Sequence, residues 1–179
     1  MEAAIPGEFD AILVQMQRQR ELERRFAMKA CETLYNGVDP AKLGPAVSDP
    51  MEHRIAFLML GRLGERKGTY DLIAAAELAV RQNPRLKLCL AGDGEVEPVR
   101  ALVKGKGLKE NIAVPGWIDA AEKLRRLREA ATLVLPSYHE GMPMAILEGM
   151  AAGKAIISTA VGAIPEVVGT ENGILVSPG

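Results

Sequence analysis

Histidine, cysteine and aromatic residues are scarce in this sequence. Only two histidines, His53 and His139, and two cysteines, Cys31 and Cys89, occur among the 179 residues. Zinc sites need several such ligands at close spacing, and these four residues do not have it. A histidine-rich zinc site is therefore excluded. Cys89 lies inside an apolar run, which predicts a buried thiol.

The sequence also lacks a strong net charge and long hydrophobic runs. Lys and Arg number 22 against 23 Asp and Glu, which argues against a nucleic-acid partner. No apolar run approaches the roughly 20 residues that a membrane-spanning helix needs. The first residues, Met1 to Phe9, lack the apolar core of a secretory signal. We therefore expect a cytoplasmic protein, whose 48% apolar residues suffice for a sizeable core.

The chain divides near Pro50 into an N-terminal region, residues 1–50, and a second region, residues 51–179. Apolar residues recur at helical spacing over Glu8–Leu34 and predict one helix there. Glycines and prolines then indicate a linker up to residue 50. The charged stretch Arg18–Arg25 is predicted to be a solvated face. Peripheral membrane contact through this stretch is the second interpretation.

After Pro50, short apolar runs alternate with helical stretches. Near-continuous apolar runs of this kind are typical of buried parallel strands. The alternation predicts an α/β fold with a doubly wound, Rossmann-like parallel sheet of about six strands, and ligands of such sheets bind beyond the carboxyl ends of the strands. The predicted strands are Ile55–Leu60, Leu86–Ala91, Ile112–Val114, Thr132–Leu135, Ala155–Ser158 and Ile174–Val176. The predicted helices are Tyr70–Gln82, Glu95–Lys104, Ala120–Glu129, Met142–Ala152 and the short turn Ile164–Val168.

The loop after the first strand, residues 61–68, combines glycines with cations. Gly61 lets the backbone approach a ligand closely, while Arg62 and Lys67 carry charges suited to a diphosphate. The helix that begins near Thr69 adds its partial positive end. A Walker A loop is excluded, because Lys-Ser or Lys-Thr does not follow the second glycine at the required spacing. A solvated loop is the alternative.

The loops after the second and third strands are less informative. Gly92 and Gly94 resemble a dinucleotide-binding turn, but Glu97 stands where the third glycine belongs, which disfavours a hydride-transfer enzyme. Gly116 is expected to leave backbone groups accessible to a nucleobase. The only tryptophan, Trp117, is predicted to be buried in packing, with a place in the wall of a base pocket as the second interpretation.

Two glutamates mark the segment after the fourth strand. Pro143 suits a first helical turn, and Gly141 gives access to the free N–H groups of that turn. Glu140 is predicted at the loop rim, where it can accept hydrogen bonds from sugar hydroxyls. Glu148 lies in an apolar helix, and a buried carboxylate there needs partners. A helix-start acid and a solvated helical acid are the alternatives for the two glutamates.

Together these segments resemble the C-terminal domain of the retaining glycosyltransferases with the two-domain GT-B architecture, of the group 1 or family 4 type. No single motif is specific, but four matching motifs in the same order on the expected elements are. The resemblance covers roughly residues 35–179. The matching motifs are Asn36-Gly37-Val38-Asp39, Gly61-Arg62-Leu63 with Lys67-Gly68, Ala91-Gly92-Asp93-Gly94, and Glu140-Gly141-Met142-Pro143 through Glu148.

The resemblance implies a role for each site residue. Arg62 and Lys67 would bind the diphosphate of a nucleotide sugar and stabilise the leaving group, and Glu140 would hold the transferred sugar. Glu148 would hold the ribose. The family generally needs no metal or other cofactor. The remaining residues expected to bind the nucleotide sugar are Gly61, Gly116, Gly141, Met142 and Pro143.

The resemblance also implies that this chain is the donor-binding half of a longer protein. Its partners would be a nucleotide-diphosphate sugar and an acceptor saccharide or lipid, the acceptor being bound by an N-terminal domain outside this chain. Two alternatives stay open. One is a sugar-nucleotide epimerase of the same architecture, and the other is a nucleotide-binding or oligomerising module without catalysis.

Overall fold

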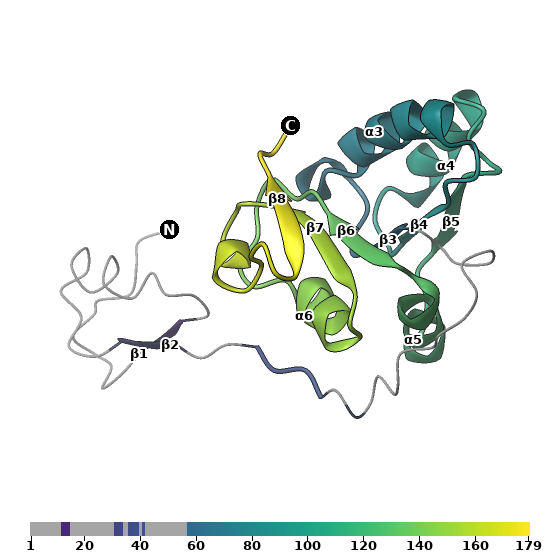
Figure 1. Cartoon of the computed structure of the whole chain (residues 1–179). Helices are drawn as coiled ribbons and strands as arrows, with labels where there is room; N and C mark the ends of the chain where they lie inside the picture. The colour runs from purple at the N-terminus through teal and green to yellow at the C-terminus, as the bar shows by residue number, and fades with distance from the viewer. Residues whose placement is uncertain (1–11, 15–30, 34–35, 40, 42–56) are drawn as a thin grey trace.

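A computed structural model describes residues 12–14, 31–33, 36–39, 41 and 57–179 of the chain. Its main body is a sheet of six parallel strands with helices on both faces (Figure 1). The α/β, doubly wound fold predicted from the sequence is confirmed. The strands are β3 (Phe57–Leu60), β4 (Leu88–Ala91), β5 (Ile112–Gly116), β6 (Thr132–Leu135), β7 (Ala155–Thr159) and β8 (Gly173–Val176).

The spatial order of the strands is β5-β4-β3-β6-β7-β8. The chain starts at the centre with β3, builds outward to β5, then returns to the other side of β3 with β6. The order therefore reverses between β3 and β6. In open α/β sheets this reversal opens a crevice outside the carboxyl ends of the two strands, where ligands bind. The loops that follow β3 and β6 are consequently the first place to look for a site.

Right-handed crossovers place the helices on opposite faces of the sheet, α3 and α4 on one and α5 and α6 on the other (Figure 1). Charges at the ends of α3 interact favourably with its dipole, with Asp71 in the first turn and Arg81 in the last. Asp119 caps α5, its side chain accepting a hydrogen bond from the Glu122 N–H at 2.8 Å. The helices are α3 (Thr69–Gln82), α4 (Val96–Gly105), α5 (Ala120–Glu129) and α6 (Met144–Ala151), with 3-10 turns η2 (Glu65–Lys67) and η3 (Ile164–Glu166).

The core is continuous from the strands into the helices that cover them. All four residues of β4 are buried, as the near-continuous apolar run predicted, and Cys89 is among them. Gly149 of α6 lies against the sheet: a Cβ at this position would stand 3.2 Å from atoms of both Leu133 and Ile156. The missing side chain therefore lets α6 pack closely on β6 and β7, which fixes the position of its neighbour Glu148.

The N-terminal helix predicted over Glu8–Leu34 is wrong at two places. Ile12–Val14 and Cys31–Thr33 form a parallel pair of short strands, β1 and β2. Ile12, Val14 and Thr33 are β-branched residues, which favour extended structure. The rest of this range and the predicted boundary at Pro50 lie outside the described residues. Within the part that the structure describes, no helix is long and apolar enough to span a membrane.

Candidate functional site

An ion pair joins the loops after β3 and β6. The 3-10 turn η2 presents Lys67, whose Nζ lies 2.6 Å from Oε1 of Glu140. The Ser137 hydroxyl donates to the same oxygen, also at 2.6 Å. The side chains of Lys67 and Glu140 are only 15% and 7% exposed. The structure thus brings two predicted site residues together at the reversal of strand order, with Ser137 as a third member that the sequence did not indicate.

Glu140 lies deeper than predicted. The sequence placed it at the loop rim, but its side chain is almost entirely buried. The reason is the two partners on one oxygen: a buried carboxylate is tolerated when a cation and a hydroxyl group compensate for the lost water. Among the described residues, the second oxygen, Oε2, has no hydrogen-bonding partner. That oxygen therefore has unused capacity to accept a hydrogen bond.

Further hydrogen bonds connect the loop after β6 to the neighbouring elements. The Tyr138 N–H donates to the Arg66 carbonyl at 2.9 Å, linking the loop after β6 to η2. The Thr159 hydroxyl donates to the Ser137 carbonyl, which ties in the end of β7. The Tyr138 hydroxyl donates to Oδ2 of Asp71 at 3.0 Å, and this hydrogen bond raises the pKa of the phenol. Backbone and side-chain hydrogen bonds therefore both fix the loop after β6.

Arg62 is held differently from Lys67. Its guanidinium lies 3.4 Å from the Asp93 carboxylate, and the two side chains are 71% and 59% exposed. The backbone beneath it is fixed, because the Leu63 N–H donates to the Asp93 carbonyl at 2.7 Å and the Gly61 N–H donates to the Ala91 carbonyl. Arg62 is thus an exposed cation on a loop whose backbone is hydrogen-bonded, and its guanidinium suits an anionic ligand.

The loop before α6 carries three predicted site residues. Pro143 occupies the cap position of α6 (one residue before the first turn), and Met142 is buried. The Met142 carbonyl accepts a hydrogen bond from the Asn36 amide at 3.1 Å, and the Gly141 carbonyl accepts one from the Ala163 N–H at 2.9 Å. The carbonyls of this loop are therefore used to anchor it.

A second predicted carboxylate, Glu148, also has a lysine partner. Nζ of Lys123, in the first turn of α5, lies 2.5 Å from Oε1 of Glu148. The expectation that a carboxylate in this apolar helix needs a partner is confirmed. Lys123 itself was not predicted, because its partner is on another helix.

Two predictions about the end of β5 and the loop that follows it are wrong. Gly116 is buried, and its carbonyl already accepts the Gly92 N–H at 2.9 Å, so that carbonyl is not openly accessible. Trp117 is 73% exposed and not buried in packing. Arg100 anchors this loop, since its guanidinium donates to the carbonyls of Val114 and Pro115, each at 2.9 Å. The backbone of this loop is thus held by hydrogen bonds from Arg100, and the indole of Trp117 remains exposed to solvent.

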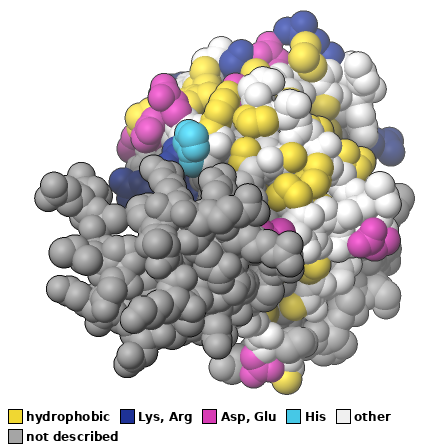
Figure 2. Space-filling view, turned by 90° about the vertical axis from the view of Figure 1, so that its left-hand side faces the viewer, with side chains coloured by type: hydrophobic (Ala, Val, Ile, Leu, Met, Phe, Trp, Pro, Cys, Tyr) yellow, Lys and Arg dark blue, Asp and Glu magenta, His cyan; other side chains and the backbone are white. Residues whose placement is uncertain are grey.

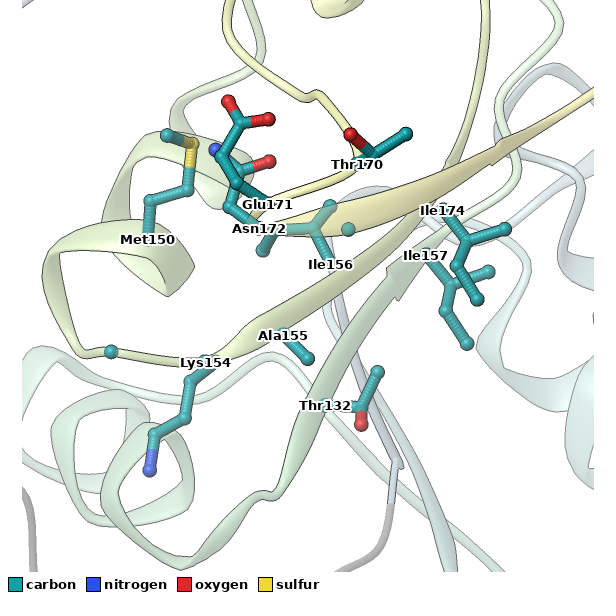
Figure 3. A pocket seen from close by; sticks show the side chains of 12 residues that line it. Thr132, Met150, Lys154, Ala155, Ile156, Ile157, Thr170, Glu171, Asn172 and Ile174 are labelled. Atoms are coloured by element: carbon teal, nitrogen blue, oxygen red, sulfur yellow. The ribbon is translucent and has the colours of Figure 1, made fainter.

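Two cavities differ in their relation to this site. One, of about 470 Å³, lies between the 37–39 segment, α5 and α6, and is lined by Lys123 and Glu148. A larger one, of about 680 Å³, lies at the opposite edge of the sheet, where β6, β7 and β8 begin. In Figure 3, Ile157 and Ile174 lie side by side there, while Lys154 and Glu171 point in different directions. It contains none of the predicted site residues and offers no converging polar groups, so we assign it no function.

The edge strand β8 adds an apolar surface to the same side of the molecule. Ile174 and Val176 are 61% and 44% exposed. Figure 2 shows hydrophobic side chains gathered on this side, with charged groups of both signs at the margin. Across residues 36–39, 41 and 57–179, no group of three or more His, Cys, Asp or Glu side chains could hold a metal ion.

The sequence matches the family described as glycosyl transferases group 1 over residues 54–179. A glycogen synthase of Mycobacterium tuberculosis is 32% identical over 146 residues, which are 80% of this chain and 35% of that protein. A putative teichuronic acid biosynthesis glycosyltransferase of Bacillus subtilis, TuaC, is 32% identical over 129 residues, or 72% of this chain and 30% of that protein. The chain thus spans about a third of the length of these curated relatives.

Solved structures show the same architecture. The C-terminal domain of a group 1 glycosyl transferase from Francisella tularensis has a TM-score of 0.67 and 28% identity, covering 79% of this chain and 80% of that one. Sucrose-phosphate synthase from Thermosynechococcus elongatus has a TM-score of 0.76 and 28% identity, covering 94% of this chain and 45% of that one. Anabaena HepE, solved with UDP and glucose, shares the fold at a TM-score of 0.77 and 20% identity, covering 94% of this chain and 49% of that one. The chain belongs to the group 1 family of glycosyl transferases and has the fold of the C-terminal domain of its GT-B members.

Proposed function

We propose that residues 57–179 bind the nucleotide sugar of a glycosyltransferase that transfers a hexosyl group with retention and without a metal. The observation that supports this most is the buried ion pair between Lys67 and Glu140. It places a cation and a carboxylate together outside the carboxyl ends of β3 and β6, where ligands of open α/β sheets bind. A diphosphate and a sugar are the chemical groups that such a pair suits.

Each residue then has a distinct part in the proposed reaction. Lys67 and the exposed guanidinium of Arg62 bind the diphosphate, while Gly61 keeps the loop backbone close to it. As the bond between the anomeric carbon and the diphosphate oxygen breaks, negative charge grows on the leaving group and these cations stabilise it. Two positive side chains supply the charge that a metal would otherwise bring, which is the basis for proposing metal-independent transfer.

The remaining site residues hold the sugar and the nucleoside. Oε2 of Glu140 accepts hydrogen bonds from hydroxyls of the transferred sugar, and Glu148 accepts them from the ribose. The N–H groups of Gly141 and Met142 face the sugar, next to the cap residue Pro143. Gly116 lies beneath the base, and the exposed Trp117 beside it forms a wall of the base pocket. The hydrogen bond from Lys67 orients the carboxylate of Glu140.

Other parts of the activity belong to the whole protein. Since the structure of HepE holds UDP and glucose, UDP is the first nucleotide to test here. We propose that an acceptor saccharide or lipid binds to a further domain and that this domain closes over the site. The predicted cytoplasmic location and the peripheral membrane contact through Arg18–Arg25 stay predictions.

Calorimetric titration of the chain with nucleoside diphosphates, nucleotide sugars and free nucleosides tests the proposal. We expect saturable binding of one base, tighter for the diphosphate than for the nucleoside. Lys109→Met, which removes an exposed lysine in the turn before β5, serves as the control for a lost charge. Absence of binding across the panel would overturn the proposal. Binding without transfer in a longer protein that includes the acceptor domain would favour a non-catalytic nucleotide-binding module.

A further inference from the structure

Lys123 occupies a position where a cation is unfavourable. It lies in the first turn of α5, at the end where the helix dipole is positive. Other charged residues of this helix pair along it, as Glu122 does with Arg125 and Arg126. Lys123 instead reaches across to α6 and contacts Glu148. The pair therefore joins two helices and is not part of the surface network of α5.

The pair opens on a cavity. The side chains of Lys123 and Glu148 are 37% and 17% exposed, more than those of Lys67 and Glu140. Both line the cavity of about 470 Å³, together with Val38, Asp39 and Met144. This space is shaped by the 37–39 segment, α5 and α6, on the side of the sheet opposite α3 and α4. A ligand in this cavity would lie beside both members of the ion pair.

The hydrogen-bonding capacity of the pair is only partly used. A lysine ammonium group has three N–H donors, and one of them is directed at Oε1 of Glu148. Among the described residues, Oε2 of Glu148 accepts no hydrogen bond. One acceptor oxygen and further N–H donors therefore stand side by side at the cavity. That combination is complementary to two neighbouring hydroxyl groups, one donating and one accepting.

We propose that Lys123 is a second residue that recognises the 2′,3′-diol of the ribose, beside Glu148. Glu148 accepts a hydrogen bond from one hydroxyl, and Lys123 donates to the oxygen of the other. This rests on the proposed function and adds a second residue that determines the preference for ribose over deoxyribose. A lysine that only neutralised Glu148 would contribute to stability but would not distinguish these sugars.

The experiment is calorimetric titration of the chain with UDP, 2′-deoxy-UDP and 3′-deoxy-UDP. The wild-type chain is expected to prefer UDP over each deoxy analogue by roughly tenfold or more, the effect of losing a hydrogen bond to a charged group. Lys123→Met is expected to reduce this preference by about fivefold, because one of the two hydroxyl contacts is lost. Lys123→Arg, which retains N–H donors, is expected to keep most of it. Lys109→Met is the matched control and leaves it unchanged.

The outcomes separate the two proposals. If UDP binds and Lys123→Met keeps the full preference for ribose, the inference is overturned and the proposed function stands. If neither UDP nor any other nucleoside diphosphate binds, the proposed function falls and the inference falls with it. Circular dichroism of each variant shows whether it is folded. Should Lys123→Met unfold, the comparison of Lys123→Arg with Lys123→Gln decides.

Discussion

Lys67 and Glu140 form an ion pair with 2.6 Å between Nζ and Oε1, although they lie 73 positions apart in the chain. Breaking a buried pair by removing one partner leaves the other charge uncompensated. Lys67→Met is therefore expected to lower the free energy of unfolding by about 3 kcal/mol. Urea denaturation measures this.

The double variant Lys67→Met/Glu140→Gln is the control for this prediction. It removes the uncompensated charge, so it should recover most of the lost stability. In the same variants, affinity for a nucleoside diphosphate is expected to fall about 10–100-fold, while affinity for the free nucleoside stays the same. Equal losses for both ligands would contradict the diphosphate role of Lys67.

Arg62 is expected to behave in the opposite way with respect to stability. Its pair with Asp93 is exposed on both sides, and exposed ion pairs contribute little. Arg62→Gln should leave the free energy of unfolding unchanged within about 0.5 kcal/mol and still weaken binding of a nucleoside diphosphate. Calorimetry at low and high salt measures this, because the wild-type affinity should depend more steeply on salt. An unchanged affinity would remove Arg62 from the site.

The fluorescence of Trp117 should report binding of the base. This residue is the only tryptophan of the chain and is 73% exposed beside Gly116. If a base stacks on it, nucleotide binding should quench its fluorescence, and Trp117→Ala should weaken binding by about 1–3 kcal/mol. Trp117→Phe retains a ring and should keep part of the affinity. Saturable binding with no change in emission would place the base elsewhere.

Gly162 packs closely against the loop that carries Glu140, because it has no side chain. Its φ is +58°, and a Cβ there would lie 2.2 Å from the Glu140 carbonyl oxygen. Gly107 has a similar φ of +69° with open space around it. Gly107→Ala should therefore cost about 1 kcal/mol for the left-handed backbone alone, whereas Gly162→Ala should cost more than about 3 kcal/mol. Thermal unfolding compares the two, and equal costs would show that the contact with Glu140 is unimportant.

Acid should loosen the start of α5 through Glu122. Hydrogen bonding to Arg125, with a further contribution from Arg126, lowers the pKa of this carboxyl from 4.5 to about 2. A lowered pKa means that its contribution to stability is complete above about pH 4.5 and disappears as the pH falls through about 2. The stability difference between the wild-type chain and Glu122→Gln should therefore shrink over that range. Urea unfolding at several pH values measures it, and a constant difference would contradict the assignment.

Local patterns predicted strands and helices of residues 57–179 well. Thr132–Leu135 and Ala120–Glu129 have the predicted bounds, because each run of residues carries its own period and its own end signals. The loops that carry Lys67 and Glu140 were predicted, whereas the burial of Glu140 was not. The rule that parallel strands present ligands at their carboxyl ends brought these loops together before the structure did.

What the sequence missed depends on distant contacts. Ser137 and Lys123 complete the two carboxylate sites through partners on other elements, and nothing in their immediate neighbourhood indicates this. One local signal was present for Lys123: a cation in the first turn of a helix interacts unfavourably with the positive end of the dipole. Trp117 was predicted to be buried from the general behaviour of tryptophan, whereas the rigid loop anchored by Arg100 directs it outward.

The reversal of strand order also determines at which stage of folding the site can form. The central strand β3 acquires β4 from the next segment of the chain, but its other neighbour, β6, arrives only after β4 and β5 have been made. Lys67 can consequently meet Glu140 only after the chain that separates them, 73 positions long, has closed into a loop. A nucleotide bound there stabilises only molecules that have completed this step. Ligand binding would thus report that β6 has paired with β3, both in a chain still being synthesised and in the finished domain.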